Sequence, residues 1–146
     1  MTKKVARKPA AKAKASTGSS AKDLAWEGKC LEAPTIFHHG EFHYLFYAGN
    51  YNNAPQQIGV AVSADGKHFR RMFGGQPILK PGAVGAWNYS ESGHPGAFQD
   101  GDGRDYLFFQ GDNLELKIDW RISLMRVKWK PASAGEPDAP FLVSPE

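Results

Sequence analysis

The sequence has one cysteine, Cys30, and a single cysteine excludes an internal disulfide and a metal site built from several thiolates. It has no apolar run long enough to cross a membrane, and its N-terminal stretch lacks the apolar segment that a secretory signal needs. We therefore expect a soluble protein without a membrane partner, cytoplasmic by default. With 41% hydrophobic and 12% aromatic residues, a chain of 146 residues is long enough for one compact domain with an apolar core.

Acidic residues are missing from the first 22 positions. Those positions hold seven of the 18 Lys and Arg residues, whereas the other 124 positions hold 11 Lys and Arg against 15 Asp and Glu. The N-terminal stretch is rich in Ala, Ser and Pro, so we expect residues 1–25 to form a disordered basic tail and residues 26–146 to fold. Because the tail has no interleaved aromatic residues and the rest of the chain is acidic, nucleic acid is not its expected partner.

The pattern of an amphipathic helix is also absent. From Glu32 onward, short β-branched and aromatic runs alternate with clusters of Gly, Asn, Asp and Pro, which predicts an all-β chain. The expected strands lie at 34–38, 42–48, 57–63, 68–72, 95–99, 105–110, 120–127 and 140–143.

A repeat organises these strands. The PTIF of residues 34–37 matches the PGAF of 95–98, and the YLFY of 44–47 matches the YLFF of 106–109. The chain thus predicts two four-stranded antiparallel units, about residues 30–75 and 90–146, with the size of β-propeller blades. Because blades bury their faces against neighbouring blades, we expect two blades to need further blades from another chain.

The residue before the first strand of each unit is expected to project into the channel on which propeller blades converge. Glu32 has this place in the first unit, and Glu91 and His94 have it in the second. A carboxylate beside the apolar Ala33 and Pro34 is expected to be partly desolvated, which raises its pKa and suits it to donate a proton. A surface glutamate at a strand start is the alternative.

Three stretches together resemble the five-bladed β-propeller glycoside hydrolases of family 43 and their family 32 relatives. They are CLEAPTIF, EFHYLFYAG and NNAPQQIGVAVSADGKHF, and the stretch WNYSESGHPGAFQDGDGRDYLFFQG fits the same families. The resemblance covers residues 26–130 and implies the C-terminal two blades of such a propeller. It implies that Glu32 is the general acid and that His94 lies on the channel axis near a water or a metal ion such as calcium. No other cofactor is expected.

The resemblance leaves the second catalytic carboxylate without a counterpart. In these families the base aspartate and a pKa-modulating aspartate precede the Glu-Ala-Pro motif, but here only the basic tail precedes Glu32. Inverting glycosidases place the base about 6.5–9.5 Å from the acid so that a water fits between the two. Glu91 is the remaining candidate in this chain, and it lies outside the family's pattern.

Polar and aromatic loops supply the candidate sugar-binding residues. Trp87 could stack on a sugar ring, while Asn88 and Tyr89 beside it, and Asn50 and Gln57 in another polar stretch, could bind hydroxyls. The alternatives are a Trp87 that packs between blades and a polar stretch that is an ordinary linker.

The chain is therefore expected to be a glycoside hydrolase-like protein whose partner is an oligosaccharide or polysaccharide. It would hydrolyse O-glycosidic bonds with Glu32 as the acid, in a truncated and catalytically incomplete form. The alternatives are a non-catalytic carbohydrate-binding module and an interaction protein that uses the cationic tail. The sugar and its linkage do not follow from the sequence, because one fold serves many substrates.

Overall fold

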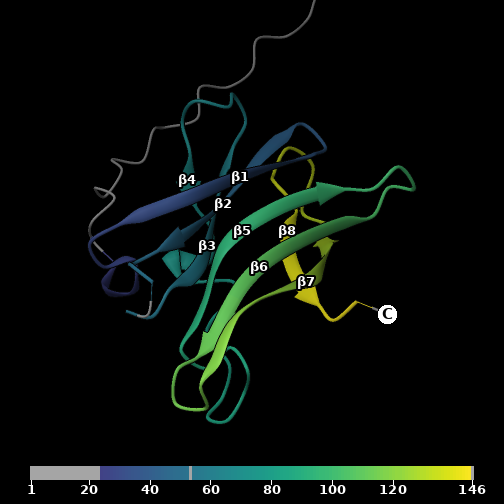
Figure 1. Ribbon diagram of the computed structural model, residues 1–146. Helices are drawn as coiled ribbons and strands as arrows, with labels where there is room; N and C mark the ends of the chain where they lie inside the picture. Colours follow the sequence, from purple (N-terminus) through teal and green to yellow (C-terminus); the bar gives the residue numbers. More distant parts are fainter. Residues whose placement is uncertain (1–23, 53, 146) are drawn as a thin grey trace, which may run out of the picture.

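The computed structural model describes residues 24–52 and 54–145, so almost all of the predicted basic tail lies outside the described residues. The chain forms two four-stranded antiparallel sheets, with the strand orders β1-β2-β3-β4 and β5-β6-β7-β8 (Figure 1). The predicted all-β fold of two four-stranded units is confirmed. The strands are β1 Leu31–His39, β2 Phe42–Gly49, β3 Gln57–Ser63, β4 Arg70–Arg71, β5 Glu91–Gln99, β6 Asp105–Asn113, β7 Ile118–Lys130 and β8 Ala139–Val143, and two 3₁₀ turns are η1 Ala25–Glu27 and η2 Phe73–Gly75.

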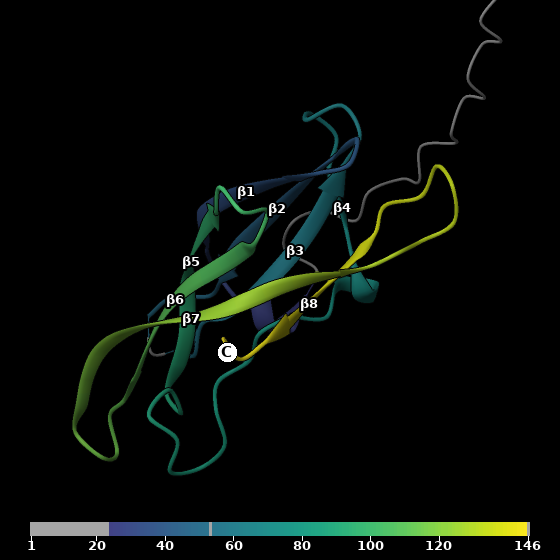
Figure 2. The ribbon, with the colours of Figure 1, turned by 90° about the vertical axis from the view of Figure 1, so that its right-hand side faces the viewer.

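The first sheet, β1 to β4, is called blade 1, and the second, β5 to β8, is called blade 2. Figure 2 shows β7, the longest strand, running beside β8. The strand expected at 68–72 is reduced to Arg70–Arg71. The cause is a turn, because the Asp65 carboxylate accepts the backbone N–H groups of Lys67 and His68 at 2.9 and 2.8 Å.

The two blades repeat each other in register. Both first strands shift register at the same place, between Glu32 and Thr35 in β1 and between Gly93 and Gly96 in β5. The residue inside each shift has a positive φ, 49° at Ala33 and 46° at His94. A proline follows each of them, and proline has no N–H to donate to the ladder. Both strands are also paired on the N-terminal side of the bulge. They therefore begin at Leu31 and Glu91, earlier than expected.

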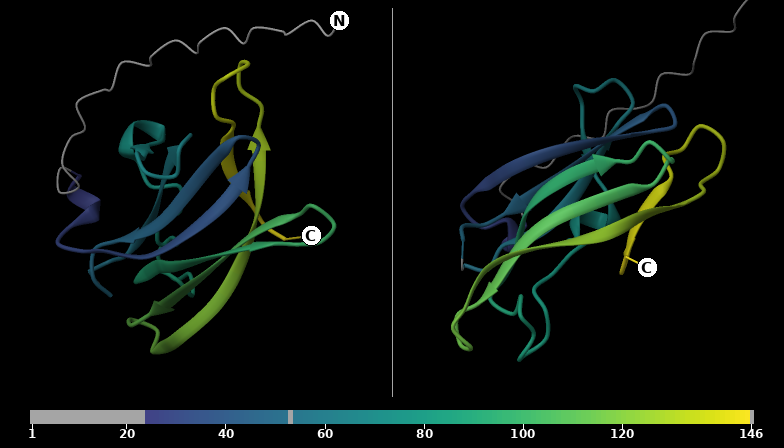
Figure 3. Two further views of the ribbon diagram at one scale, coloured as in Figure 1. Left: turned by 90° about the horizontal axis from the view of Figure 1, so that it is seen from above. Right: turned by 45° about the vertical axis from the view of Figure 1, so that its right-hand side comes forward.

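The two sheets lie side by side (Figure 3). The buried residues of both sheets form one apolar core. Trp129 of β7, in blade 2, is partly buried and packs against this core. Its ring stacks on His39 at 4.1 Å and lies 4.5 Å from Tyr44, both in blade 1, and its Nε1 donates to Asp105 at 2.6 Å. The innermost strands are also joined, because the Ala97 N–H donates to Thr35 Oγ1 at 2.9 Å.

The opposite side of blade 1 is partly covered by the segment that precedes β1. Trp26 stacks on Tyr47 at 5.8 Å between ring centroids. Glu27 is buried, receives two 2.7 Å hydrogen bonds from Arg71 and accepts the Tyr47 hydroxyl at 2.7 Å. This segment therefore caps blade 1 on the side that faces away from blade 2. No helix within the described ranges has the length and hydropathy of a membrane span.

Candidate functional site

Glu32 lies directly before the bulge of β1, and its side chain is 32% exposed. Three side chains surround the carboxylate. Gln56 donates its amide N–H to Oε1, His94 of blade 2 places Nε2 at 3.7 Å from the same oxygen, and the Cys30 thiol lies 3.8 Å from Oε2. The first of these contacts fixes Oε1, while the partial exposure leaves the carboxylate open to a ligand.

His94 reaches Glu32 because the positive φ of the bulge turns its side chain out of the regular alternation of β5. Its Nδ1 lies 2.8 Å from Gln110 Nε2, and the same amide nitrogen donates to Glu91 Oε1 at 3.2 Å. A carboxylate only accepts, so the Gln110 amide nitrogen is the donor and Nδ1 of His94 is an acceptor. The neutral imidazole then carries its proton on Nε2, the nitrogen that faces Glu32.

Glu91 is not the counterpart of Glu32. Glu32 pairs with Ala48 and Gly93 pairs with Gln110, so the position in blade 2 that is equivalent to Glu32 is Gly93. The Glu91 side chain is fully buried, as is Asp112, its cross-strand neighbour, whose pKa is raised by desolvation. A buried carboxylate does not suit the activation of a solvent water. Glu91 therefore lies behind His94, to which Gln110 links it, and is not an open second carboxylate.

Gln56 donates to Glu32, whereas the residue predicted from the sequence was its neighbour Gln57. Gln57 begins β3 and pairs with Gly49, whereas Gln56 is fully buried and its Oε1 has no hydrogen-bond partner among the described residues. Gly93 passes directly over this amide, and a Cβ at Gly93 would overlap with Gln56 Oε1. The backbone of blade 2 therefore lies directly against Gln56, the residue that donates to Glu32.

The predicted loop residues are largely engaged with the protein. The Trp87 ring packs against Phe109 at 5.7 Å and against the core, which is the packing alternative considered for it. The Asn88 amide donates to Ser92 Oγ at 2.8 Å, and Tyr89 is half-buried in the same loop. Asn50 has a φ of 78° and donates its side-chain amide to the Ala54 carbonyl. Of this set, no ring presents a fully open platform for a sugar.

The metal ion suggested for His94 finds few ligands. Over residues 24–52 and 54–145, no three His, Cys, Asp or Glu side chains gather as a metal site. His94 and Glu32 alone do not fit a bound calcium, which takes six to eight oxygen ligands.

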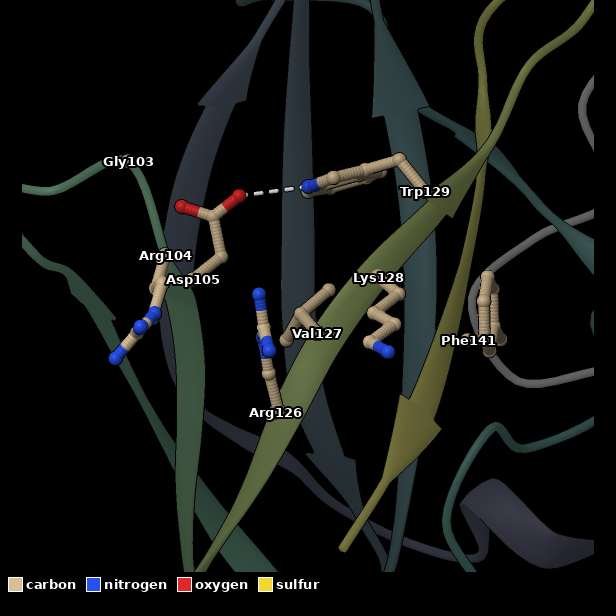
Figure 4. Close-up of a pocket in the computed structure, with 8 residues that line it drawn as sticks. All are labelled: Gly103, Arg104, Asp105, Arg126, Val127, Lys128, Trp129 and Phe141. Carbon is tan, nitrogen blue, oxygen red and sulfur yellow. Dashed lines mark hydrogen bonds between the residues drawn. The ribbon is translucent and has the colours of Figure 1, made fainter. Parts of the chain in front are cut away.

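A separate groove of about 310 Å³ lies at the opposite end of β6 from Glu91. Arg104, Arg126 and Lys128 line it together with Trp129 and Phe141 (Figure 4). None of the side chains around Glu32 takes part in this groove.

No protein-family model matches the sequence, and a search of curated proteins finds no match. The fold does match solved structures. An exo-1,5-α-L-arabinanase from a bovine ruminal metagenomic library has a TM-score of 0.63 and 22% identity, over 77% of this chain and 38% of that protein. A thermostable family-43 glycoside hydrolase has a TM-score of 0.65 and 20% identity, over 84% of this chain and 39% of that protein. An α-L-arabinanase from Cellvibrio cellulosa, complexed with arabinohexaose, has a TM-score of 0.57 and 20% identity, over 77% of this chain and 36% of that protein.

These likenesses establish the fold. The chain has the architecture of two neighbouring blades of the β-propeller of family-43 glycoside hydrolases, as the resemblance of its motifs implied. It spans less than half the length of the structures that it matches.

Proposed function

We propose that this chain supplies the acid half of a glycoside hydrolase site, with Glu32 as the general acid. The observation that carries the proposal is the half-open Glu32 carboxylate, which Gln56 of blade 1 and His94 of blade 2 hold at the point where the two blades meet. A fold shared with glycoside hydrolases supports the same class of chemistry.

The contacts of the carboxylate support one position for its proton. Oε1 faces two N–H donors, the Gln56 amide and Nε2 of His94, whereas Oε2 faces only the weak thiol donor of Cys30 at 3.8 Å. In this proposal, a protonated Glu32 therefore keeps its proton on Oε2. In the reaction, that proton passes to the glycosidic oxygen as the bond between carbon and oxygen breaks, and Glu32 is left as a carboxylate. His94 then stabilises the new charge on Oε1.

Glu91 has a positioning role in this proposal. It accepts the Gln110 amide, which in turn bonds Nδ1 of His94, so it fixes the orientation and tautomer of the imidazole without touching a substrate. The base that activates water would come from residues outside this pair of blades, because Glu91 and Asp112 are both buried. We expect the described chain alone to bind sugar and to hydrolyse it very slowly.

Pentose oligosaccharides are the proposed substrate class. The structures with the same fold include arabinanases and an endo-1,4-β-xylanase from Bacteroides thetaiotaomicron. Trp87 is not assigned to the substrate, because it packs on Phe109, and Tyr89 remains the aromatic candidate in that loop.

The test supplies the missing nucleophile. Azide attacks the anomeric carbon of an aryl arabinoside or aryl xyloside, forms a glycosyl azide and releases the phenol, and the acid is needed only when the phenol is a poor leaving group. With a phenyl leaving group, Glu32→Gln should lower the azide-dependent rate by about 10²–10⁴-fold, the usual contribution of a general acid. With a 2,4-dinitrophenyl leaving group, the two proteins should react at similar rates.

Glu115→Gln is the matched control, because Glu115 is an exposed glutamate in the β6–β7 turn. It should leave both rates unchanged. Equal loss of rate with both leaving groups in the Glu32 variant would contradict a role in proton donation.

A non-catalytic carbohydrate-binding module is the second candidate, and the burial of Glu91 and Asp112 favours it. It predicts that calorimetric titration with arabino- or xylo-oligosaccharides gives equal affinity for the wild type and Glu32→Gln, with no azide-dependent turnover in either protein.

A further inference from the structure

The side of blade 2 that faces away from blade 1 has large apolar residues that are exposed to solvent. It is called the outer face and consists of Phe98 of β5, Tyr106 and Phe108 of β6, and Ile122 and Leu124 of β7. Phe98 is 49% exposed, Phe108 40% and Ile122 79%. An apolar surface of this kind usually marks a site of association.

The equivalent face of blade 1 is covered, so the repeat allows the two faces to be compared. By register, the row Phe98–Tyr106 of blade 2 is equivalent to Phe37–Tyr44 of blade 1, and Phe108–Leu124 is equivalent to Phe46–Val60. All four blade 1 residues are buried. What covers them is the inner side of blade 2, whose main contributors are Leu107, Phe109, Val127 and Trp129.

We infer that the outer face of blade 2 docks blade 1 of a second copy of this chain, and that this contact continues the interface between the two blades within one chain. The inner side of a blade presents Ala97 and Leu107, and the equivalent positions of blade 1 are Ile36 and Leu45. Ile36 is exposed and Leu45 is half-buried, so the side of blade 1 that a second copy would offer is apolar at the required positions.

The cap on blade 1 decides which part of that side is used. Trp26 covers Tyr47, at the end of blade 1 that is far from the β1–β2 turn. The contact is therefore made by the half of blade 1 next to this turn, where Ile36 and Leu45 lie.

Charge supports the same orientation. Within one chain, Gln99 at the hairpin end of blade 2 bonds the backbone of His38 at the turn end of blade 1, at 3.3 and 3.1 Å. Repeating that contact places the β1–β2 turn of the second copy, with its exposed Glu41, beside the basic groove of Arg104 and Arg126. The smallest closed assembly is a dimer, in which both outer faces are covered.

Sedimentation equilibrium of the full chain tests this inference. The wild type should have twice the chain mass of 16.0 kDa at concentrations up to about 0.1 mM, where even weak specific contacts associate. Phe98→Asp and Ile36→Asp should each give a single chain, because they place a charge on opposite sides of the same contact. Val84→Asp, which changes an exposed loop residue, should leave the dimer intact.

A mixture of the two monomeric variants adds a second readout. Each variant keeps one intact side, so the mixture should recover a dimer that is held by one contact and dissociates at higher concentration than the wild type. Circular dichroism should be unchanged, because both positions are exposed.

Three outcomes would overturn the inference. A wild type that is a single chain at every concentration would exclude a second copy as the occupant. A dimer lost in Phe98→Asp but kept in Ile36→Asp would mean that two outer faces pair with each other. Association only with a different added protein would assign the face to that partner.

Discussion

Blade 1 and blade 2 share strand order, register and a bulge at the same position, yet equivalent side chains lie in opposite environments. Phe46 of blade 1 is buried, whereas its equivalent Phe108 in blade 2 is partly open to solvent. The difference arises because blade 2 covers the side of blade 1 that carries Phe46, whereas no part of the described chain covers the outer face of blade 2, which carries Phe108. The apolar residues repeated in both blades therefore indicate which face of a blade can pack against another blade. Whether that face is buried depends on the presence of the neighbouring blade.

The blades also differ at the bulge. Blade 1 has Glu32 where blade 2 has Gly93, and blade 2 contributes His94, Gln110 and the buried Glu91 instead. The absence of a side chain at Gly93 lets the backbone approach Gln56, which donates to Glu32. The two repeats thus contribute different parts to this site, with Glu32 on one blade and His94, Gln110 and Glu91 on the other.

The largest expected effect separates the two equivalent phenylalanines. Phe46→Ala should lower the free energy of unfolding by about 3–5 kcal/mol, the usual cost of emptying a buried phenylalanine site. Phe108→Ala should cost about 1 kcal/mol, because part of its ring already contacts water. Urea unfolding at low protein concentration, which minimises any contribution from association, measures both values. Equal losses would mean that Phe108 is covered in the monomer.

The cap on blade 1 should give the next largest effect. Glu27→Gln leaves Arg71 without its anionic partner in a buried site, and we expect a loss of about 3 kcal/mol. The matched control is Glu136→Gln, whose carboxylate lies 3.7 Å from Arg70 with both side chains mostly exposed, and which should cost less than about 0.5 kcal/mol. Thermal unfolding of both variants makes the comparison. If the two variants are equally stable, the cap does not hold blade 1.

Alanine substitutions at two glycines of β5 should also differ in their effect on the free energy of unfolding. Gly93→Ala forces a Cβ against the Gln56 amide, so we expect a loss of about 1–3 kcal/mol and a weakened hold on Glu32. Gly96→Ala places its Cβ at an ordinary 3.7 Å from Phe108 and should be neutral or stabilising by about 0.5 kcal/mol. Chemical denaturation measures both values. A neutral Gly93→Ala would show that the backbone of blade 2 does not constrain Gln56.

The strands were predictable because their aromatic and β-branched runs alternate and end at Gly and Asp turns. The bulge was not, since a period of two does not show where a strand gains a residue. That bulge decides which residues meet Glu32, so the equivalence proposed for Glu91 was wrong and the role of Gln110 was missed. Whether Gln56 or Gln57 faces the site likewise depends on where β3 begins.

The smallest expected effect concerns a link between the blades. His39 of blade 1 lies 3.1 Å from the carboxylate of Asp138, which precedes β8 of blade 2 and also accepts the Ala132 N–H at 2.9 Å. The Ala132 N–H and, after it, His39 lower the pKa of Asp138 below its ordinary value of 3.8. The folded state therefore binds this proton more weakly than the unfolded state does, so the stabilisation is complete above 3.8 and is lost as the pH falls through the lowered pKa.

Asp138→Asn should accordingly lower the melting temperature at neutral pH, and the gap to the wild type should narrow as the pH falls below 3.8. Asp119→Asn, at an exposed position of β7, is the control and should show no such gap at either pH. Melting curves recorded from pH 7 downward follow the difference. A gap that stays constant with pH would mean that Asp138 acts through its shape and backbone contacts, and that its charge does not join the blades.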